Sequence, residues 1–190
     1  MKSKRCLFDL LLLLLLAAAA YVSSFKGTWQ FDDFRCIVDN EAIRSGSLLK
    51  LWRFSPGRFL AFLTFWANYQ SCALDIFWYH LVNLFIHVLN CFLFYWFLLL
   101  LQESHGVNEG KRFPAFMCAA LFLVHPVQTQ AVTYIVQRLE LLCFTFIAAH
   151  LIFLLLALRN KLFYIPAVLV LIAGLFCKEN MAVAPLIALL

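Results

Sequence analysis

Long apolar runs alternate with short polar stretches along the whole chain, a pattern typical of helices that cross a membrane. A helix needs about 20 apolar residues to cross the hydrocarbon core of a bilayer. The apolar runs that reach or approach this length cover residues 6–22, 76–101, 113–124, 141–158 and 162–177, and another run begins at 181. The pattern predicts an all-α fold: a polytopic transmembrane helical bundle with five or six membrane helices.

The polar stretches divide this single transmembrane domain, residues 1–190, into three parts. Residues 1–24 form the first span, residues 25–75 an external loop with interfacial helices, and residues 76–190 the remaining spans. The first run follows three positive charges, Lys2, Lys4 and Arg5. A cleaved signal peptide is the alternative, but the later spans favour an uncleaved anchor. By the positive-inside rule the N-terminus then lies in the cytoplasm.

Composition identifies lipid as the solvent, since 65% of the residues are hydrophobic and only 13% are charged. A soluble domain keeps roughly 25% of its residues charged. The net charge of +5 is small and scattered, which argues against a nucleic-acid partner. None of the seven cysteines has the spacing of a metal site. Cys36 and Cys72 lie outside the spans and could pair, but we expect no disulfide role.

Under this topology the unusual polar residues gather at the external ends of the spans. Ionisable groups at membrane depth are costly and usually functional, so the arrangement predicts an external site partly embedded in the membrane. These residues are Asp32, Asp33, Asp75, His80, His125, Gln128, Gln130, Arg138, Glu140, Lys178 and Glu179.

The adjacent pair Asp32 and Asp33 is the most specific candidate for a catalytic site in this set. Neighbouring carboxylates repel, which raises the pKa of one of them unless a cation or metal intervenes. Such a pair can divide the work of a general base from that of a substrate or cation ligand. A solvated acidic loop is the alternative interpretation of two adjacent aspartates.

Four polar residues of the second span, His80, Asn83, His87 and Asn90, fall within an arc of roughly 80° on one helix face. Interhelical hydrogen bonding is the common role of such residues in membrane bundles, and we predict it for Asn83, His87 and Asn90. His80 lies near the external end, where contact with a substrate is an equal alternative.

Three further positions carry candidate chemistry at this end. His125 and Pro126 interrupt the third span, and broken helices at membrane depth usually line a cavity. Arg138 has the planar fork that suits phosphate, with pairing to Glu140 or to a lipid headgroup as the alternative. Lys178 and Glu179 end a span, where a simple interfacial pair is the alternative to a binding role.

Several short motifs follow one another in a fixed order from Trp29 to Pro185. They are FDDF (31–34) with IVDN (37–40) and Ile43; Arg58 with LTF (63–65) and NY (68–69); YHLVN (79–83) with His87; HPVQTQAV (125–132) with Arg138; and KEN (178–180) with Pro185. Each motif alone is weak, but the ordered set resembles the N-terminal part of polytopic GT-C glycosyltransferases. It is most similar to the transmembrane-and-tetratricopeptide-repeat O-mannosyltransferase-like family and its bacterial counterparts.

The resemblance implies a membrane glycosyltransferase that transfers a sugar, with mannose as a candidate, from a polyprenyl-phosphate donor to a hydroxyl of an acceptor protein or glycan. It implies that Asp32 or Asp33 is the catalytic base. The candidate ligands of substrate and lipid phosphate are His80, His125, Arg138, Lys178 and Glu179. A divalent metal is a candidate cofactor, with Asp32 and Asp33 as its ligands. The implied location is a bacterial inner membrane, with the active site on the periplasmic side.

The chain also departs from the family pattern. Gln130 stands where we expect glutamate, and the missing carboxylate would weaken a metal site or an acceptor contact. Members of the family continue for several more spans and tetratricopeptide repeats, so we expect a truncated chain that is inactive alone. A degenerate, non-enzymatic membrane scaffold or assembly subunit is therefore the alternative function, and a transporter comes third.

Overall fold

The computed structural model describes residues 2–107, 110 and 112–189, and side chains from Leu7 onward within these ranges. The side chains of Lys2, Lys4 and Arg5, on which the predicted orientation depends, lie outside this part. Within it the secondary structure is helical, without strands, so the all-α prediction is confirmed.

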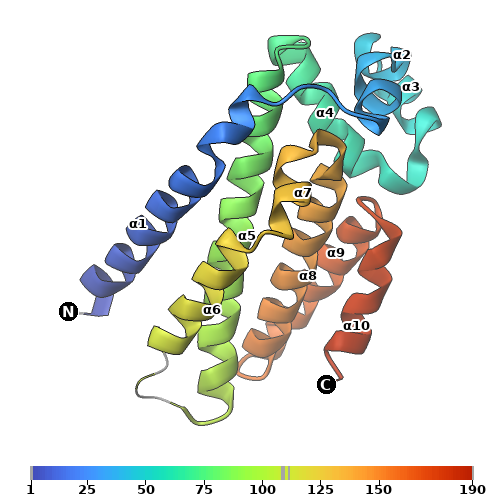
Figure 1. The fold of residues 1–190 in the computed structure, drawn as a ribbon. Helices are drawn as coiled ribbons and strands as arrows, with labels where there is room; N and C mark the ends of the chain where they lie inside the picture. Colours follow the sequence, from blue (N-terminus) through green and yellow to red (C-terminus); the bar gives the residue numbers. More distant parts are fainter. Residues whose placement is uncertain (1, 108–109, 111, 190) are drawn as a thin grey trace.

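Five helices form an elongated bundle, and the helices of residues 41–72 cover one end of it (Figure 1). The bundle helices are α1 (Lys2–Tyr21), α5 (Ile76–Ser104), α6 (Arg112–Val124), α8 (Arg138–Ala157) and α9 (Tyr164–Leu175). The other α-helices are α2 (Glu41–Arg44), α3 (Leu48–Phe54), α4 (Phe59–Cys72), α7 (Gln128–Thr133) and α10 (Ala184–Ile187).

Three helical segments of the described chain are long and apolar enough to cross a membrane: Leu7–Lys26, Ile76–Ser104 and Ile135–Ala157. Two shorter apolar helices, Arg112–Val124 and Lys161–Leu175, accompany them. A helix of 13 residues such as α6 covers roughly 20 Å of a hydrocarbon core of about 30 Å. The predicted five or six membrane helices are therefore three full-length and two shorter ones.

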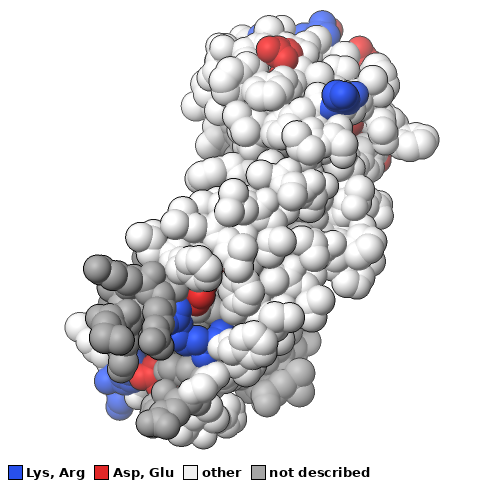
Figure 2. Space-filling view, turned by 60° about the vertical axis from the view of Figure 1, so that its left-hand side comes forward, with Lys and Arg blue, Asp and Glu red and all other residues white. Residues whose placement is uncertain are grey.

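The two ends of the bundle differ in how they are built. The N-terminus, the turn from α5 to α6 and the turn from α8 to α9 lie at one end (Figure 1). The opposite end carries residues 27–75, 125–137 and 178–183, and we refer to it as the loop end. Figure 2 shows charged side chains toward both ends of one face and an uncharged band between them, as expected for a membrane protein. The orientation, with the N-terminus in the cytoplasm and the loop end outside, stays a prediction.

The polar stripe of α5 joins helices, as its spacing predicts. Asn83 Nδ2 donates to the Ile135 carbonyl at 3.1 Å, and Asn90 Nδ2 donates to the Leu141 carbonyl at 2.8 Å. The Nε2 atom of His87 lies 3.0 Å from the carbonyl oxygen of Leu123. Since all three stripe residues are fully buried, the prediction of interhelical hydrogen bonding is confirmed.

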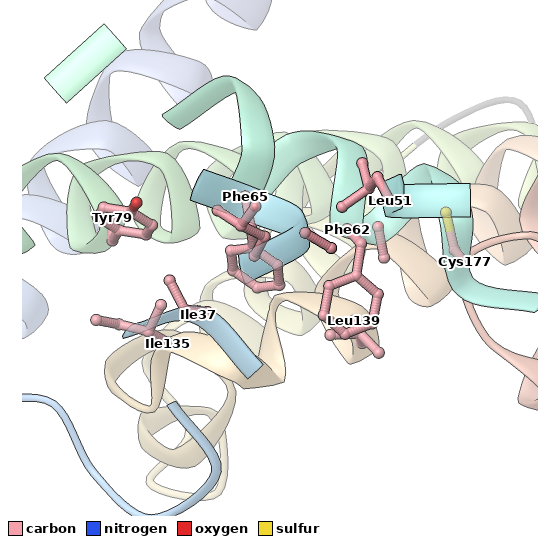
Figure 3. Packing of buried hydrophobic residues seen from close by; sticks show 11 residues of the cluster. Ile37, Leu51, Phe62, Phe65, Tyr79, Ile135, Leu139 and Cys177 are labelled. Carbon is pink, nitrogen blue, oxygen red and sulfur yellow. The ribbon is translucent and has the colours of Figure 1, made fainter. Parts of the chain in front are cut away.

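A hydrophobic cluster holds the short helices of the loop end onto the bundle. Phe62 and Phe65 of α4 pack with Ile37 from the preceding loop and with Tyr79 and Leu139 from the bundle (Figure 3). The cluster brings the first polar loop against the start of α8, although about a hundred residues separate them in the sequence. This packing gives the candidate site a rigid support.

Candidate functional site

Asp33 is an anchor of the first polar loop, because its carboxylate is buried and fully engaged. The residue is only 1% exposed. Its Oδ1 accepts the Val136 amide at 2.8 Å and its Oδ2 accepts the Gln30 amide at 3.0 Å. Burial raises the pKa of Asp33 and repulsion from Asp32 adds to this, while the amide hydrogen bonds lower it. A carboxylate held in this way fixes the loop and has no free face for a substrate.

Asp32 lies next to this anchor but is exposed at the surface of the loop end. Its backbone amide donates to the Tyr134 hydroxyl at 3.0 Å, and no hydrogen bond to its carboxylate is found among the described residues. The structure therefore distinguishes two residues that the sequence leaves equivalent. Asp32 is the carboxylate that a substrate can reach, and Asp33 is the carboxylate that holds it in place.

His80 is buried beneath the segment that enters the first loop, with 1% of its surface exposed. Neither ring nitrogen has a hydrogen-bond partner among the described residues. Gly27 lies directly against the ring, since a Cβ atom at position 27 would come within 2.9 Å of His80 Nε2. Only glycine fits this approach without a shift of the ring. Contact between His80 and a substrate stays a prediction.

Arg138 is fully buried within a network of neutral groups. Its Nε donates to Asn83 Oδ1 and its Nη1 to Asn68 Oδ1, each at 2.7 Å, and its Nη2 donates to the Tyr79 carbonyl at 3.1 Å. The guanidinium also lies 4.4 Å from the centre of the Phe65 ring. This network joins α4, α5 and α8 and leaves no exposed edge of the guanidinium. In this conformation the guanidinium is not open to a phosphate, and the phosphate contact at Arg138 stays a prediction.

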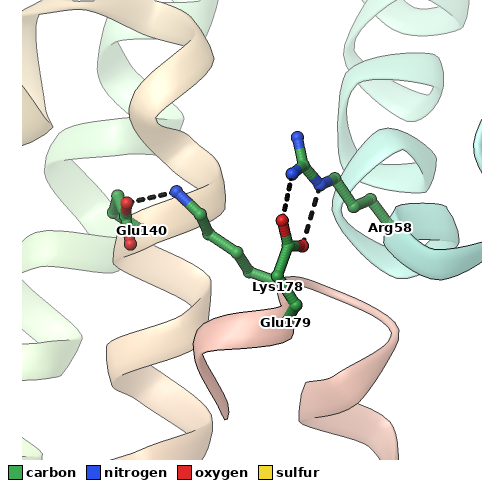
Figure 4. Close-up of polar contacts among 4 residues, drawn as sticks. All are labelled: Arg58, Glu140, Lys178 and Glu179. Carbon is green, nitrogen blue, oxygen red and sulfur yellow. Dashed lines mark hydrogen bonds and ion pairs between the residues drawn. The ribbon is translucent and has the colours of Figure 1, made fainter. Parts of the chain in front are cut away.

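Lys178 and Glu179 form two ion pairs that tie the turn after α9 to its neighbours (Figure 4). Lys178 Nζ pairs with Glu140 at the start of α8. Glu179 accepts from Arg58 through both carboxylate oxygens, one of them 3.1 Å from Arg58 Nε. Glu140 therefore pairs with Lys178, not with Arg138. The turn after α9 is thereby joined at the loop end to α8 and to the residue that precedes α4.

The Arg58–Glu179 pair predicts a small, acid-sensitive contribution to stability. The hydrogen bonds from Arg58 lower the pKa of Glu179 from 4.5 to about 2. A carboxyl group whose pKa is lower in the folded state stabilises the fold above its unfolded pKa, and this contribution is lost as the pH falls from about 4.5 to about 2. Because the pair is exposed, the effect should stay below about 1 kcal/mol.

The Glu179→Gln variant tests this contribution. Its unfolding temperature in detergent should equal that of the wild type at or below about pH 2 and lie slightly below it near pH 7. The exposed Glu41→Gln substitution is the matched control and should follow the wild type at both pH values. A Glu179→Gln variant that differs from the wild type equally at both pH values would contradict the assignment.

The interruption of the third span is confirmed, because α6 ends at Val124. The His125 ring is exposed, and its Nδ1 accepts the Val127 amide at 3.2 Å, which shapes the turn into α7. Gln130, the residue that departs from the family pattern, is exposed on α7. His125 thus forms the break itself, and a contact with phosphate stays a prediction.

A cavity of about 290 Å³ lies beside the interrupted span, between α5, α6, α7, α8 and the turn that follows α9. Phe122, Phe144 and Ile147 form part of an apolar wall. Gln128, Glu140, Asn180 and Asn90 contribute polar groups, and the remaining lining residues are Ala131, Leu141 and Cys143. Because Lys178 pairs with Glu140, a cation adjoins the lining of this cavity.

No group of three or more His, Cys, Asp or Glu residues suited to a metal ion is found within the described residues. Each carboxylate oxygen of Asp33 accepts one backbone amide, from Gln30 or from Val136. Cys36 and Cys72 are both free thiols. The metal thus remains an untested expectation.

Two residues of the site are not among the candidate site residues that the sequence predicts. Tyr134 receives the Asp32 amide, and Asn68 accepts from Arg138. Asn68 belongs to one of the ordered motifs, but its partner is 70 residues away. Tyr134 follows the HPVQTQAV segment by two residues, and neither spacing nor periodicity relates it to Asp32.

Three proteins of known sequence are similar to most of this chain. Protein O-mannosyl-transferase Tmtc3 of Drosophila melanogaster is 34% identical over 78% of the chain and 19% of its own length. Protein O-mannosyl-transferase F38B6.6 of Caenorhabditis elegans is 31% identical over 90% of the chain and 26% of its own length. Human protein O-mannosyl-transferase TMTC1 is 31% identical over 74% of the chain and 17% of its own length.

No family model matches the chain, and no solved structure matches it. The similarity to the named relatives agrees with the resemblance carried by the ordered motifs, and it extends over most of the chain. The chain spans about a sixth to a quarter of the length of these relatives. The similarity over most of the chain therefore supports a relationship to the TMTC-like family of protein O-mannosyl-transferases.

Proposed function

We propose that the protein carrying this chain is a GT-C type membrane glycosyltransferase that transfers mannose from a polyprenyl-phosphate donor to a hydroxyl of a protein or glycan. The observation that carries the proposal is the exposed Asp32, held by an anchored loop at one end of an apolar helical bundle. The names of the relatives support a mannosyl group. Because the chain spans only part of those relatives, we propose the activity for the whole protein and not for residues 1–190 alone.

In the proposed reaction Asp32 is the general base. The acceptor hydroxyl attacks the anomeric carbon of the sugar while its proton passes to the Asp32 carboxylate. The bond between the anomeric carbon and the phosphate oxygen breaks, and the lipid phosphate leaves with its electron pair. Groups that neutralise this developing charge usually supply a large catalytic contribution. Lys178 and His125 are the candidates at the loop end for this role.

The cavity beside α6 supports a lipid-linked donor. Its wall is apolar and lies among membrane helices, while its polar groups and Lys178 lie on the side of the loop end. An amphipathic ligand, with a hydrocarbon chain and a phosphate, matches this change from an apolar to a polar lining. A volume of about 290 Å³ is near the lower limit for ligand pockets, so the cavity would hold one part of the donor lipid.

The donor class can be tested directly in membrane vesicles that contain the protein. Vesicles are supplied with labelled mannose linked either to a polyprenyl phosphate or to a nucleotide, and transfer to acceptor protein is measured. We expect transfer from the lipid-linked donor alone. Transfer from the nucleotide-linked donor, in vesicles unable to convert it to the lipid-linked form, would contradict the proposed donor.

A non-enzymatic scaffold is the second candidate, and the observation that favours it is Gln130. If glutamate at this position is required for catalysis, an exposed glutamine leaves the protein without activity. A Gln130→Glu variant that gains transfer over an inactive wild type would favour the degenerate copy.

The location in a bacterial inner membrane, with the active site on the periplasmic side, is part of the proposal. The three relatives named above are animal proteins.

A further inference from the structure

We infer that Tyr134 is a positioning residue for Asp32, and that it acts by holding a strained turn in which Asp32 sits. The inference rests on the proposed function, because it assumes that Asp32 acts on the acceptor. It adds a residue that none of the ordered motifs contains. Three independent features of the structure carry it.

The first feature is the backbone on either side of Asp32. Phe31 has a φ of 40°, in the left-handed region that residues other than glycine rarely adopt. Directly after Asp33, residues Phe34–Val38 form a π-helical turn. Single π-helical turns are rare and are frequent at functional sites. Two uncommon conformations thus flank one exposed carboxylate, and such strain persists only where the surroundings enforce it.

The second feature is the set of hydrogen bonds that enforces this shape. The Asp33 carboxylate accepts the Gln30 amide, which closes the turn from within. It also accepts the Val136 amide, which fixes the turn to the segment that leads into α8. Tyr134 Oη accepts the Asp32 amide at 3.0 Å. The turn is therefore held at two successive residues by the short segment 134–136.

The third feature is the place of the Tyr134 side chain itself. Its ring packs edge to face against the ring of Phe31, with 6.3 Å between the ring centres. Burial raises the pKa of Tyr134, so its hydroxyl stays protonated near neutral pH and accepts the amide through a lone pair. Tyr134 therefore contacts both Phe31, the residue with the strained backbone, and the backbone amide of Asp32. The buried anchor of the loop is the Asp33 carboxylate.

These contacts separate the roles of Tyr134 and Asp33. Removal of the buried Asp33 carboxylate would leave two amides without partners and loosen the loop. Removal of only the Tyr134 hydroxyl leaves the ring contact and the buried anchor, and water can replace it at an exposed amide. The expected loss is therefore in the placement of Asp32 and not in folding. A misplacement of about 1 Å can reduce a rate 100-fold.

The test is the Tyr134→Phe variant of the whole protein in membrane vesicles. We expect kcat to fall on the order of 10- to 100-fold, with KM for donor and acceptor unchanged within about twofold. The unfolding temperature should stay unchanged. Hydrogen exchange at the Asp32 amide should become faster, while exchange at the Val136 amide stays slow.

Tyr69→Phe is the matched control, because Tyr69 is also partly buried at the loop end and no hydrogen bond of its hydroxyl is found among the described residues. It should retain full kcat. A Tyr134→Phe variant with wild-type kcat, or with unchanged exchange at the Asp32 amide, would overturn the inference. If Asp32→Asn is inactive in the same assay, the proposed function survives that result. If Asp32→Asn is active, Asp32 is not the base, and that part of the proposed function fails independently of Tyr134.

Discussion

Replacing Asp32 with asparagine is expected to lower mannosyl transfer by about 10²- to 10⁴-fold, the usual contribution of a general base. The substitution keeps the size of the side chain and removes its ability to take up a proton. Since the residue is exposed and its amide still bonds to Tyr134, membrane insertion and thermal stability should stay as in the wild type. Transfer is measured with purified protein in vesicles, and insertion is measured by protease protection of the first polar loop.

Asp39→Asn is the matched control for this experiment, because Asp39 is an exposed carboxylate of the same loop. It should leave transfer unchanged. Asp33→Asn should differ from both, since it weakens a buried anchor and therefore lowers stability as well as transfer. Full activity in both the Asp32→Asn and the Asp33→Asn variants would contradict an aspartate base in this loop, and a wild type without transfer would favour a scaffold.

The largest loss of stability is expected for Arg138→Ala. The substitution leaves the side-chain oxygens of Asn68 and Asn83 buried without their donor, and it opens a void beside Phe65. Each unsatisfied buried group costs about 1–3 kcal/mol, so the free energy of unfolding should fall by roughly 2–5 kcal/mol even after the relief of burying a charge. Thermal unfolding in detergent measures the change.

Arg53→Ala is the control for this substitution, because Arg53 is exposed at the same end of the molecule. Its unfolding temperature should match the wild type. The Arg138→Ala variant also tests the predicted phosphate contact. Wild-type stability together with a raised KM for the lipid-linked donor would contradict the structural role and would favour Arg138 as a phosphate ligand.

The sequence predicts the fold and part of the site, because both depend on local patterns. Apolar run lengths predict the spans, and the 3.6-residue period predicts that Asn83, His87 and Asn90 share a face and bond to other helices. His125 and Pro126 predict the early end of α6. In each of these cases the relevant residues are close together in the sequence.

The remainder of the site depends on contacts between distant segments, which no local pattern contains. Asp32 and Asp33 are adjacent and chemically identical, and only the position of the Val136 amide separates a buried anchor from an exposed carboxylate. Lys178 likewise pairs with Glu140, because α8 and the turn after α9 pack together. The sequence alone does not distinguish this pairing from a contact with a ligand. The role of Tyr134 is beyond sequence pattern for the same reason.

The bond between Asp33 and Val136 has a consequence for how the protein is assembled during synthesis. It joins residues 103 positions apart, so it cannot form until the chain between them has left the ribosome and its helices have been inserted. Closing so long a loop has an entropic cost that only the packed helices repay. A nascent chain with its first span alone therefore carries Asp32 on an unstructured tether. Asp32, the proposed base, would be placed only after α5, α6 and the segment that leads into α8 have been made, which would couple the proposed activity to insertion of these helices.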